Sequence, residues 1–263
     1  MALAEDYWSL FKLIKETLEF EDPPGQWSYF IYCTYSTHFA ETYANLIPQT
    51  IPDVQFSDCS TVPVCAFDRF VVDRFRSYID AYFKYYLPSP GSKEMHDAMH
   101  LDYIRVTPGA SVSEAREHFK THVVPNDDPE ACQMNRYQMF VVIDDESLLS
   151  MLEGPAPVTK LEGSVDCYYN GQMDLYVEKT CGEEEMFVKI VDVGYDEASG
   201  GIVTSSKARG KIPKDSPHCT TFYGWFKACP RSLLVLISDL EIFDGLKGVF
   251  NTLKRPDCVY SSI

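Results

Sequence analysis

The side chains best suited to acid–base chemistry lie in or directly after apolar segments of the second half of the chain. Asp192 lies near the end of the apolar segment 186–193, Lys227 lies in the segment 221–229, and Asp144 follows a third such run. A carboxylate can accept a proton from a substrate, and an ammonium can stabilise the negative charge that then develops. We therefore expect Asp192 to act as a base and Lys227 as its electrostatic partner.

Aromatic side chains next to these groups are candidates for a substrate-binding wall. Tyr223 and Trp225 share one face of the segment that carries Lys227, and aromatic residues make up 14% of the chain. Asp144 is a further binding candidate, because open α/β sheets bind ligands beyond the carboxyl ends of their strands. The competing interpretation is that Tyr223 and Trp225 are core residues and that Lys227 only lays its aliphatic stem along the surface.

A second pattern suggests iron chemistry. His100 and Asp102 form a His-x-Asp pair, His218 can supply a distant second imidazole, and Arg231 can bind a cosubstrate carboxylate. Two imidazoles and one carboxylate on one face of iron are typical of oxygenases that use 2-oxoglutarate. That activity belongs to a double-stranded β-helix, however, whereas this sequence predicts long helices.

Two further clusters have simpler explanations. Glu114, His118 and His122 follow one another at four-residue intervals, and three such residues span about 12 Å of helix, too far to close on one ion. The acidic run 144–146 is similar to a magnesium-binding cluster of all-helical prenyl-diphosphate enzymes. Here it follows a strand, where acids cap the next helix and compensate its dipole.

Motifs that bind common cofactors do not occur in the sequence. It contains no Gly-x-Gly-x-x-Gly, phosphate-binding loop, Gly-x-Ser-x-Gly or His-Glu-x-x-His. This disfavours dinucleotide enzymes, P-loop nucleotidases, α/β-hydrolases and zincins. We expect neither a cofactor nor a metal ion.

Composition restricts the partners and the compartment. The formal charge of −16 repels nucleic acid and anionic membranes. The N-terminus has acidic residues where a secretory signal would be basic, and no window has the roughly 18 apolar residues of a membrane span. The nine cysteines form no Cys-x-x-Cys pair and are expected to be reduced thiols. We expect a soluble, cytoplasmic protein that acts on a small molecule, of unknown oligomeric state.

The elements that would position these residues centre on the segment 137–143. It is an unbroken apolar and aromatic run that leads directly into a helix over 145–152. Such a run is typical of a strand covered on both faces. Further strands are predicted at 27–35, 103–106, 186–193 and 221–229. The prediction is an α/β fold, a layered domain with a mixed, largely buried β-sheet flanked by helices.

Helices are predicted between and around these strands, at 3–19, 37–47, 67–86, 112–123 and 230–240. Ser111 and Glu114 have the spacing of a capping box. We expect residues 1–263 to form a single domain, with a β-hairpin insertion at 158–182 that turns at Asn170-Gly171 and a mobile loop at 194–220.

Several phrases together resemble a large group of uncharacterised proteins of filamentous fungi. They are Trp27-x-x-(apolar)-x-Tyr32-x-Thr34-Tyr35, the segment 109–119, the strand and helix of 142–148, the strand 187–192 and Gly224-Trp225-Phe226-Lys227. The group has no assigned reaction, so no functional residue is carried over. The resemblance implies a fungal intracellular protein from a specialised-metabolite or paralogue-rich setting.

Our leading hypothesis is a cofactor-independent enzyme of the cyclase or isomerase kind that acts on a small apolar or aromatic metabolite. Abundant aromatic residues without a cofactor motif favour it, because such a pocket needs shape and one or two acid–base groups. A non-enzymatic acidic module that binds a basic protein is an alternative. Two further alternatives are the iron oxygenase and a tRNA-dependent cyclodipeptide synthase. The negative charge of the chain opposes the synthase, because it repels tRNA.

Overall fold

The computed structural model of the chain describes a helix-flanked sheet and its connections. The described residues are 27–49, 54–85, 96–125, 128, 135–153, 186–196, 202–204, 219–233, 236–237 and 246–250. The predicted helix 3–19 and hairpin 158–182 lie outside the described residues, as does most of the predicted loop 194–220. Within the described ranges, no helix combines the length and the apolar character needed to cross a membrane.

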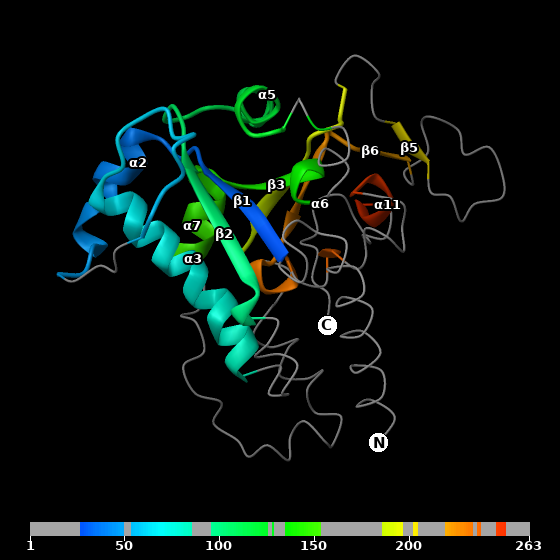
Figure 1. Cartoon of the computed structure of the whole chain (residues 1–263). Coiled ribbons are helices and arrows are strands. Elements are labelled where there is room, and N and C mark those ends of the chain that lie inside the picture. Colours follow the sequence, from blue (N-terminus) through cyan, green and yellow to red (C-terminus); the bar gives the residue numbers. More distant parts are fainter. Residues whose placement is uncertain are drawn as a thin grey trace, which may run out of the picture.

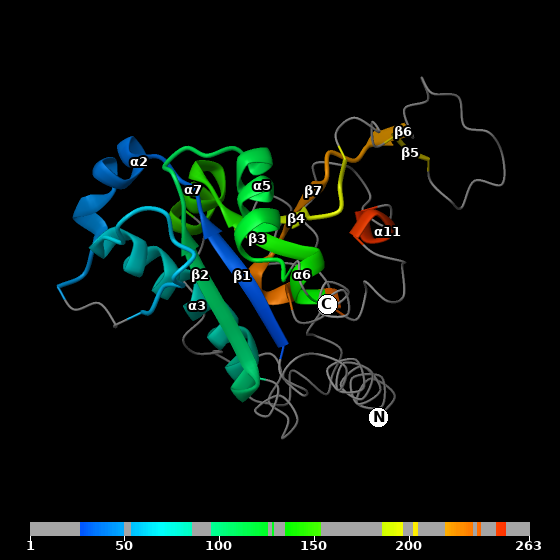
Figure 2. The same ribbon diagram turned by 45° about the horizontal axis from the view of Figure 1, so that its top comes forward.

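In the part of the chain that the structure describes, the main sheet has five strands in the order β2-β1-β3-β4-β7 (Figures 1 and 2). They are β1 (Trp27–Cys33), β2 (Met99–Arg105), β3 (Met139–Ile143), β4 (Val188–Asp192) and β7 (Trp225–Ala228). β1 is parallel to both β2 and β3, whereas β4 is antiparallel to both β3 and β7. The carboxyl ends of β1, β2, β3 and β7 therefore lie at one edge, and the carboxyl end of β4 lies at the opposite edge.

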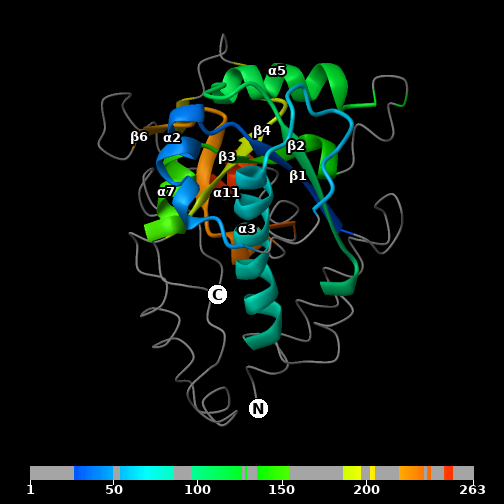
Figure 3. The same cartoon turned by 90° about the vertical axis from the view of Figure 1, so that its left-hand side faces the viewer.

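Helices cover both faces of this sheet. The long helix α3 (Ala66–Tyr85) and α7 (Asp145–Glu153) pack on one face, and α5 (Val112–His122) lies across the other (Figures 2 and 3). The remaining elements are α2 (Thr37–Thr42), η1 (Ala44–Leu46), α6 (Asn135–Gln138), β5 (Ile202–Thr204), β6 (Cys219–Thr221), η4 (Pro230–Ser232) and α11 (Leu246–Phe250). The mixed, helix-flanked sheet predicted from the sequence is confirmed.

The central strand β3 supplies both hydrophobic layers. Val141 and Ile143 pack under α3 and α7, while Phe140 and Val142 pack under α5. All five residues of β3 are buried, because alternate side chains point to opposite covered faces. Burying each such side chain contributes about 1.5–3 kcal/mol. The unbroken apolar run that predicted a central strand reflects this double covering.

The start of α5 is fixed by the predicted capping box. Ser111 Oγ accepts a hydrogen bond from the Glu114 N–H at 3.2 Å, and Glu114 Oε2 accepts one from the Ser111 N–H at 2.7 Å. These bonds satisfy two backbone donors that the first helical turn leaves without partners. The hydrogen bonds that the Glu114 carboxylate accepts from the Ser111 N–H and hydroxyl hold the pKa of Glu114 below its ordinary value. The helix that carries Arg116 and Lys120 thus begins at a defined residue.

A buried ion pair joins α3 to the first two strands. Arg105 Nε lies 3.0 Å from Asp68 Oδ1, and the Tyr35 hydroxyl donates to the same carboxylate. The Arg105 guanidinium also donates to the carbonyl of Cys33 at 2.6 Å. Each charge is therefore paired and hydrogen-bonded, which is the condition under which buried charges are tolerated. The first half of the sheet is fastened to its covering helix in this way.

Several predicted boundaries shift. β2 begins four residues before the predicted strand 103–106, at Met99, because all seven of its residues pair with β1. The predicted strand 221–229 is divided, since β7 starts at Trp225 after a left-handed Gly224 with φ 75°. Residues 135–138, partly predicted as strand, form the short helix α6.

Candidate functional site

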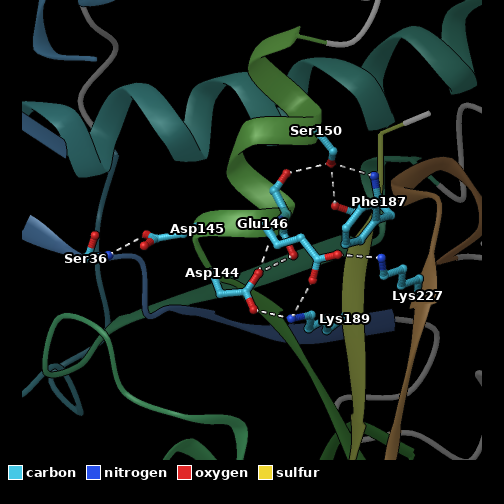
Figure 4. A network of polar contacts seen from close by, with 9 residues as sticks. Ser36, Asp144, Asp145, Glu146, Ser150, Phe187, Lys189 and Lys227 are labelled. Carbon is cyan, nitrogen blue, oxygen red and sulfur yellow. Dashed lines mark hydrogen bonds and ion pairs between the residues drawn. The ribbon is translucent and has the colours of Figure 1, made fainter. Parts of the chain in front are cut away.

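The carboxyl edge of the parallel strands carries a network of four charged side chains (Figure 4). Asp144 follows β3, Glu146 lies in the first turn of α7, Lys189 lies in β4, and Lys227 is paired with it across the sheet in β7. Lys189 Nζ contacts Asp144 Oδ2 and lies 3.1 Å from Glu146 Oε2. Lys227 Nζ lies 2.6 Å from Glu146 Oε1. Two of the sequence candidates, Asp144 and Lys227, thus meet through Glu146 and Lys189.

Each charged side chain of the network is paired with at least one of opposite charge. Although partial burial acts in the opposite direction, Lys227 and Lys189 hold the pKa of Glu146 below its ordinary value. Burial likewise acts to lower the pKa of Lys189, and Asp144 and Glu146 outweigh it and raise that pKa. Each ammonium also lies over an aromatic ring, Lys189 over Trp225 at 4.8 Å and Lys227 over Phe187 at 4.1 Å. The network ties α7 to β4 and β7.

Hydrogen bonds connect the segments that follow the carboxyl ends of β1 and β3. This is the point where the chain order of the sheet reverses, which is where open α/β sheets usually bind ligands. Here the Ser36 N–H donates to Asp145 Oδ1 at 2.7 Å, and the Thr34 N–H donates to the Ile143 carbonyl at 3.0 Å. These bonds join the segment after β1 to the end of β3 and to the start of α7.

Asp192 lies at the other edge of the sheet. It pairs with Met139 at the amino end of β3, whereas Lys189 pairs with Lys227 and lies three residues earlier in β4. Three strand residues span about 10 Å. The expectation that Asp192 and Lys227 act together in one site does not fit this geometry. The reason is the antiparallel direction of β4, which carries its carboxyl end away from those of β3 and β7.

A hollow opens beside Asp192, on the side of the sheet that α5 covers. Its volume is about 520 Å³, and it is lined by Lys120, Val124, Tyr137, Gln138, Asp192, Val193 and Gly194. The lining comes from the end of α5, from α6 and from the residues where β4 ends. Small-molecule sites typically enclose about 300–1,000 Å³.

The surroundings of Asp192 shift the pKa of its carboxyl. Burial raises the pKa of its carboxyl above the ordinary value, against the opposing effect of the Gly194 N–H, which donates to Oδ1 at 2.8 Å, and of Arg116 and Lys120. A raised pKa brings a carboxylate closer to neutral pH, where it exchanges protons effectively. Among the described residues, Asp192 alone has a carboxyl with a raised pKa and also lines this hollow.

Arg116 fixes the backbone around Asp192. Its buried guanidinium donates to the Asp192 carbonyl at 2.9 Å and to the Gly224 carbonyl at 3.2 Å. The same group lies over the Tyr195 ring at 5.1 Å. α5 therefore holds the ends of β4 and β7 in register, and Arg116 positions Asp192 without contacting the hollow.

The two aromatic candidates do not line this hollow. Tyr223 is 63% exposed, and Trp225 is half-buried beneath Lys189. Neither is among the described lining residues. Tyr137, from α6, supplies the aromatic ring of the wall instead.

The residues considered for metal binding are engaged with one another. His100 Nε2 lies 3.0 Å from Asp102 Oδ1, and Asp102 Oδ2 pairs with Arg136 at 3.1 Å. His218 lies outside the described residues. The described sheet is open and flanked by helices, which differs from the double-stranded β-helix that an oxygenase of this type needs. In the part of the chain that the structure describes, no group of three His, Cys, Asp or Glu residues is arranged to hold a metal.

The histidines of α5 also have local roles. His118 Nδ1 lies 2.8 Å from the Tyr32 hydroxyl, and its ring stacks on His122 with centroids 4.4 Å apart. Burial, and then the proximity of His122, hold the pKa of His118 below its ordinary value. The His118 ring also packs edge-on against Tyr32 with centroids 5.6 Å apart, so it belongs to the packing of α5 on the sheet.

Sequence reasoning missed Lys120, Arg116 and Lys189. A usable signal existed for Lys189, because a lysine interrupts the otherwise apolar run 186–191 and a buried lysine needs a carboxylate partner. Arg116 follows the buried Ala115 in an amphipathic helix, so its burial was foreseeable and its partners were not. Nothing in the sequence around Lys120 indicates that it faces the end of β4.

Comparison with known proteins gave no family model, curated protein or solved structure that matches this chain. The site is therefore interpreted from its own geometry.

Proposed function

We propose that the protein is a cofactor-independent enzyme of fungal specialised metabolism that carries out acid–base chemistry of the cyclase or isomerase kind on a small apolar or aromatic metabolite. The observation that supports this most directly is the Asp192 carboxyl, whose pKa burial raises, in the wall of a hollow of about 520 Å³. In this proposal Asp192 is the base, as we expected from the sequence. Lys120 is its electrostatic partner in place of Lys227.

The reaction proposed needs one group that moves a proton. Asp192 in its ionised form takes a proton from an acidic C–H or O–H bond of the substrate, and the electron pair shifts within the substrate. The protonated Asp192 then returns the proton to another atom of the same molecule, so the product is an isomer and no external oxidant or reductant is used. Lys120 supplies positive charge in the wall of the hollow, which favours a bound molecule that carries negative charge.

The experiment that tests this proposal is solvent isotope exchange. The full chain is incubated in D₂O with a mixture of small aromatic and terpenoid metabolites, and deuterium incorporation and isomer formation are followed by mass spectrometry and NMR. We expect catalysed exchange in at least one component. Asp192→Asn should reduce it by about 10²-fold or more, the usual contribution of a general base.

The matched control is Asp73→Asn, the same chemical change in α3 on the other face of the sheet. It should leave exchange unchanged. Exchange that survives in Asp192→Asn, or that is lost equally in both variants, contradicts the assignment of Asp192 as the base.

A further inference from the structure

The walls of the Asp192 hollow suit a flat apolar body. Val124 and Val193 supply aliphatic surface, and Tyr137 supplies an aromatic ring. The Tyr137 ring is itself held in place, because it packs against Phe30 with centroids 5.9 Å apart and lies under the Arg136 guanidinium at 5.1 Å. A fixed ring favours planar ligands, which stack on it without ordering a flexible side chain.

One cation faces the hollow and is available to a ligand. Lys120 pairs with Glu117 at 3.6 Å, but the Glu117 side chain is 73% exposed, so this pair is weak and exchangeable in water. The guanidinium of Arg116, by contrast, is occupied by the carbonyls of Asp192 and Gly224. A ligand anion can therefore replace Glu117 at Lys120.

The single carboxylate of the hollow does not cancel this cation. Asp192 Oδ1 accepts a hydrogen bond from the Gly194 N–H at 2.8 Å, so the backbone already engages this carboxylate, whereas the ion pair of Lys120 with Glu117 is exchangeable. The chain charge of −16 opposes anions at long range, but salt screens charges beyond about 8 Å at physiological ionic strength. Within the hollow, the local ammonium decides which ligand charge is preferred.

From these observations we infer that the hollow binds small planar, aromatic molecules that carry one carboxylate, with the carboxylate at Lys120 and the ring against Tyr137. The statement that such ligands react rests on the proposed function, whereas the statement that they bind does not. Binding is a separate property, and it can be measured without turnover.

Three probes of matched shape test the inference. They are 4-hydroxyphenylacetate, its neutral amide and the cationic tyramine, titrated into the full chain and followed by calorimetry and ligand-observed NMR. We expect the acid to bind about tenfold or more tightly than the amide, because a favourable charge contact at a partly exposed site contributes about that much. Tyramine should bind most weakly. Lys120→Met should remove the preference for the acid while retaining binding of the amide.

The matched control is Lys247→Met in α11, an exposed lysine that does not line the hollow. It should keep the preference for the acid. Equal affinity for acid and amide in the unmodified chain, tightest binding of tyramine, or no binding of any probe at millimolar concentration overturns the inference. Preferred binding of acids without isotope exchange would leave the inference standing and reject the proposed reaction, so the two failures are distinguishable.

Discussion

The pKa values of Glu146 and Asp192 are shifted in opposite directions, and single contacts explain each shift. Glu146 accepts hydrogen bonds from two lysines, which favour its ionised form. Asp192 is dominated by burial, which favours its neutral form. Such a difference separates a carboxylate that stabilises the fold from one suited to proton transfer.

For Asp192 we predict that replacement by asparagine stabilises the protein at neutral pH. The folded-state pKa lies above the ordinary value of 3.8, so ionisation costs the folded state free energy as the pH rises through the raised pKa. Asp192→Asn removes that cost and keeps an oxygen for the Gly194 N–H. Thermal unfolding from pH 3 to 8 should show equal stability of the two proteins below pH 3.8 and a higher Tm of the variant above the raised pKa. The Tm of the variant minus that of the unmodified chain should rise from pH 3 to pH 8. A fall in this difference would contradict the prediction.

For Glu146 the sign is reversed. Its folded-state pKa lies below the ordinary value of 4.5, so its stabilising contribution is present above pH 4.5 and is lost as the pH falls through the lowered pKa. Glu146→Gln should cost about 1–2 kcal/mol at pH 7, since the side chain is half-exposed and water screens its ion pairs. Urea unfolding at pH 7 and pH 3 measures this, and a cost that persists undiminished at pH 3 would assign it to packing.

At the scale of elements, the junction of α5 with the ends of β4 and β7 holds the hollow together. Arg116 spans this junction, and Gly224 lies beneath it with φ 75°. A Cβ atom on Gly224 would lie 2.3 Å from Cγ of Tyr195 and 2.7 Å from Nη2 of Arg116. The close approach explains why the strand before Trp225 is interrupted by a glycine.

This geometry predicts that Gly224→Ala is strongly destabilising. The variant combines left-handed strain of about 1–2 kcal/mol with a clash that must displace Tyr195 or Arg116. Gly109→Ala is the matched control, because Gly109 has φ 78° and nothing within 4 Å of its added Cβ. Denaturant unfolding should show a cost for Gly224→Ala that exceeds that of Gly109→Ala by about 1–3 kcal/mol. Equal costs would show that the junction can adjust.

At the scale of the whole molecule, the sheet has a hydrophobic core on each face. A side chain buried in that core reacts with a reagent only when the whole domain opens. Cys33 is fully buried in β1, and burial, together with the nearby Asp68 carboxylate, raises the pKa of its thiol to about 12. Cys65, before α3, is exposed. Thiolate is the reactive form, so Cys33 reacts only when the sheet opens.

We predict that a thiol reagent at pH 8 labels Cys65 at least about a hundredfold faster than Cys33, because a stable domain is open for less than about a thousandth of the time. Peptide mass mapping of the labelled chain over time measures both rates. In denaturant the two cysteines should react alike. Similar rates in the native protein would mean that β1 is not held as the structure shows.

The sequence by itself determined which segments form the sheet and which of them is central. The apolar run ending at Ile143, the box of Ser111 and Glu114, and the periodicity of α3 are local patterns, and local patterns specify local structure. They sufficed for the α/β class and for the mixed, helix-flanked sheet.

Only the tertiary structure decided that β4 runs antiparallel to its neighbours. Strand direction depends on how the chain returns to the sheet, and nothing in the apolar pattern of 188–192 records it, because a strand buried on both faces looks the same in either direction. That direction moves Asp192 away from Lys227 and places it beside Lys120 and Tyr137. The candidate site is therefore a consequence of a non-local choice, made by packing between segments that are distant in sequence.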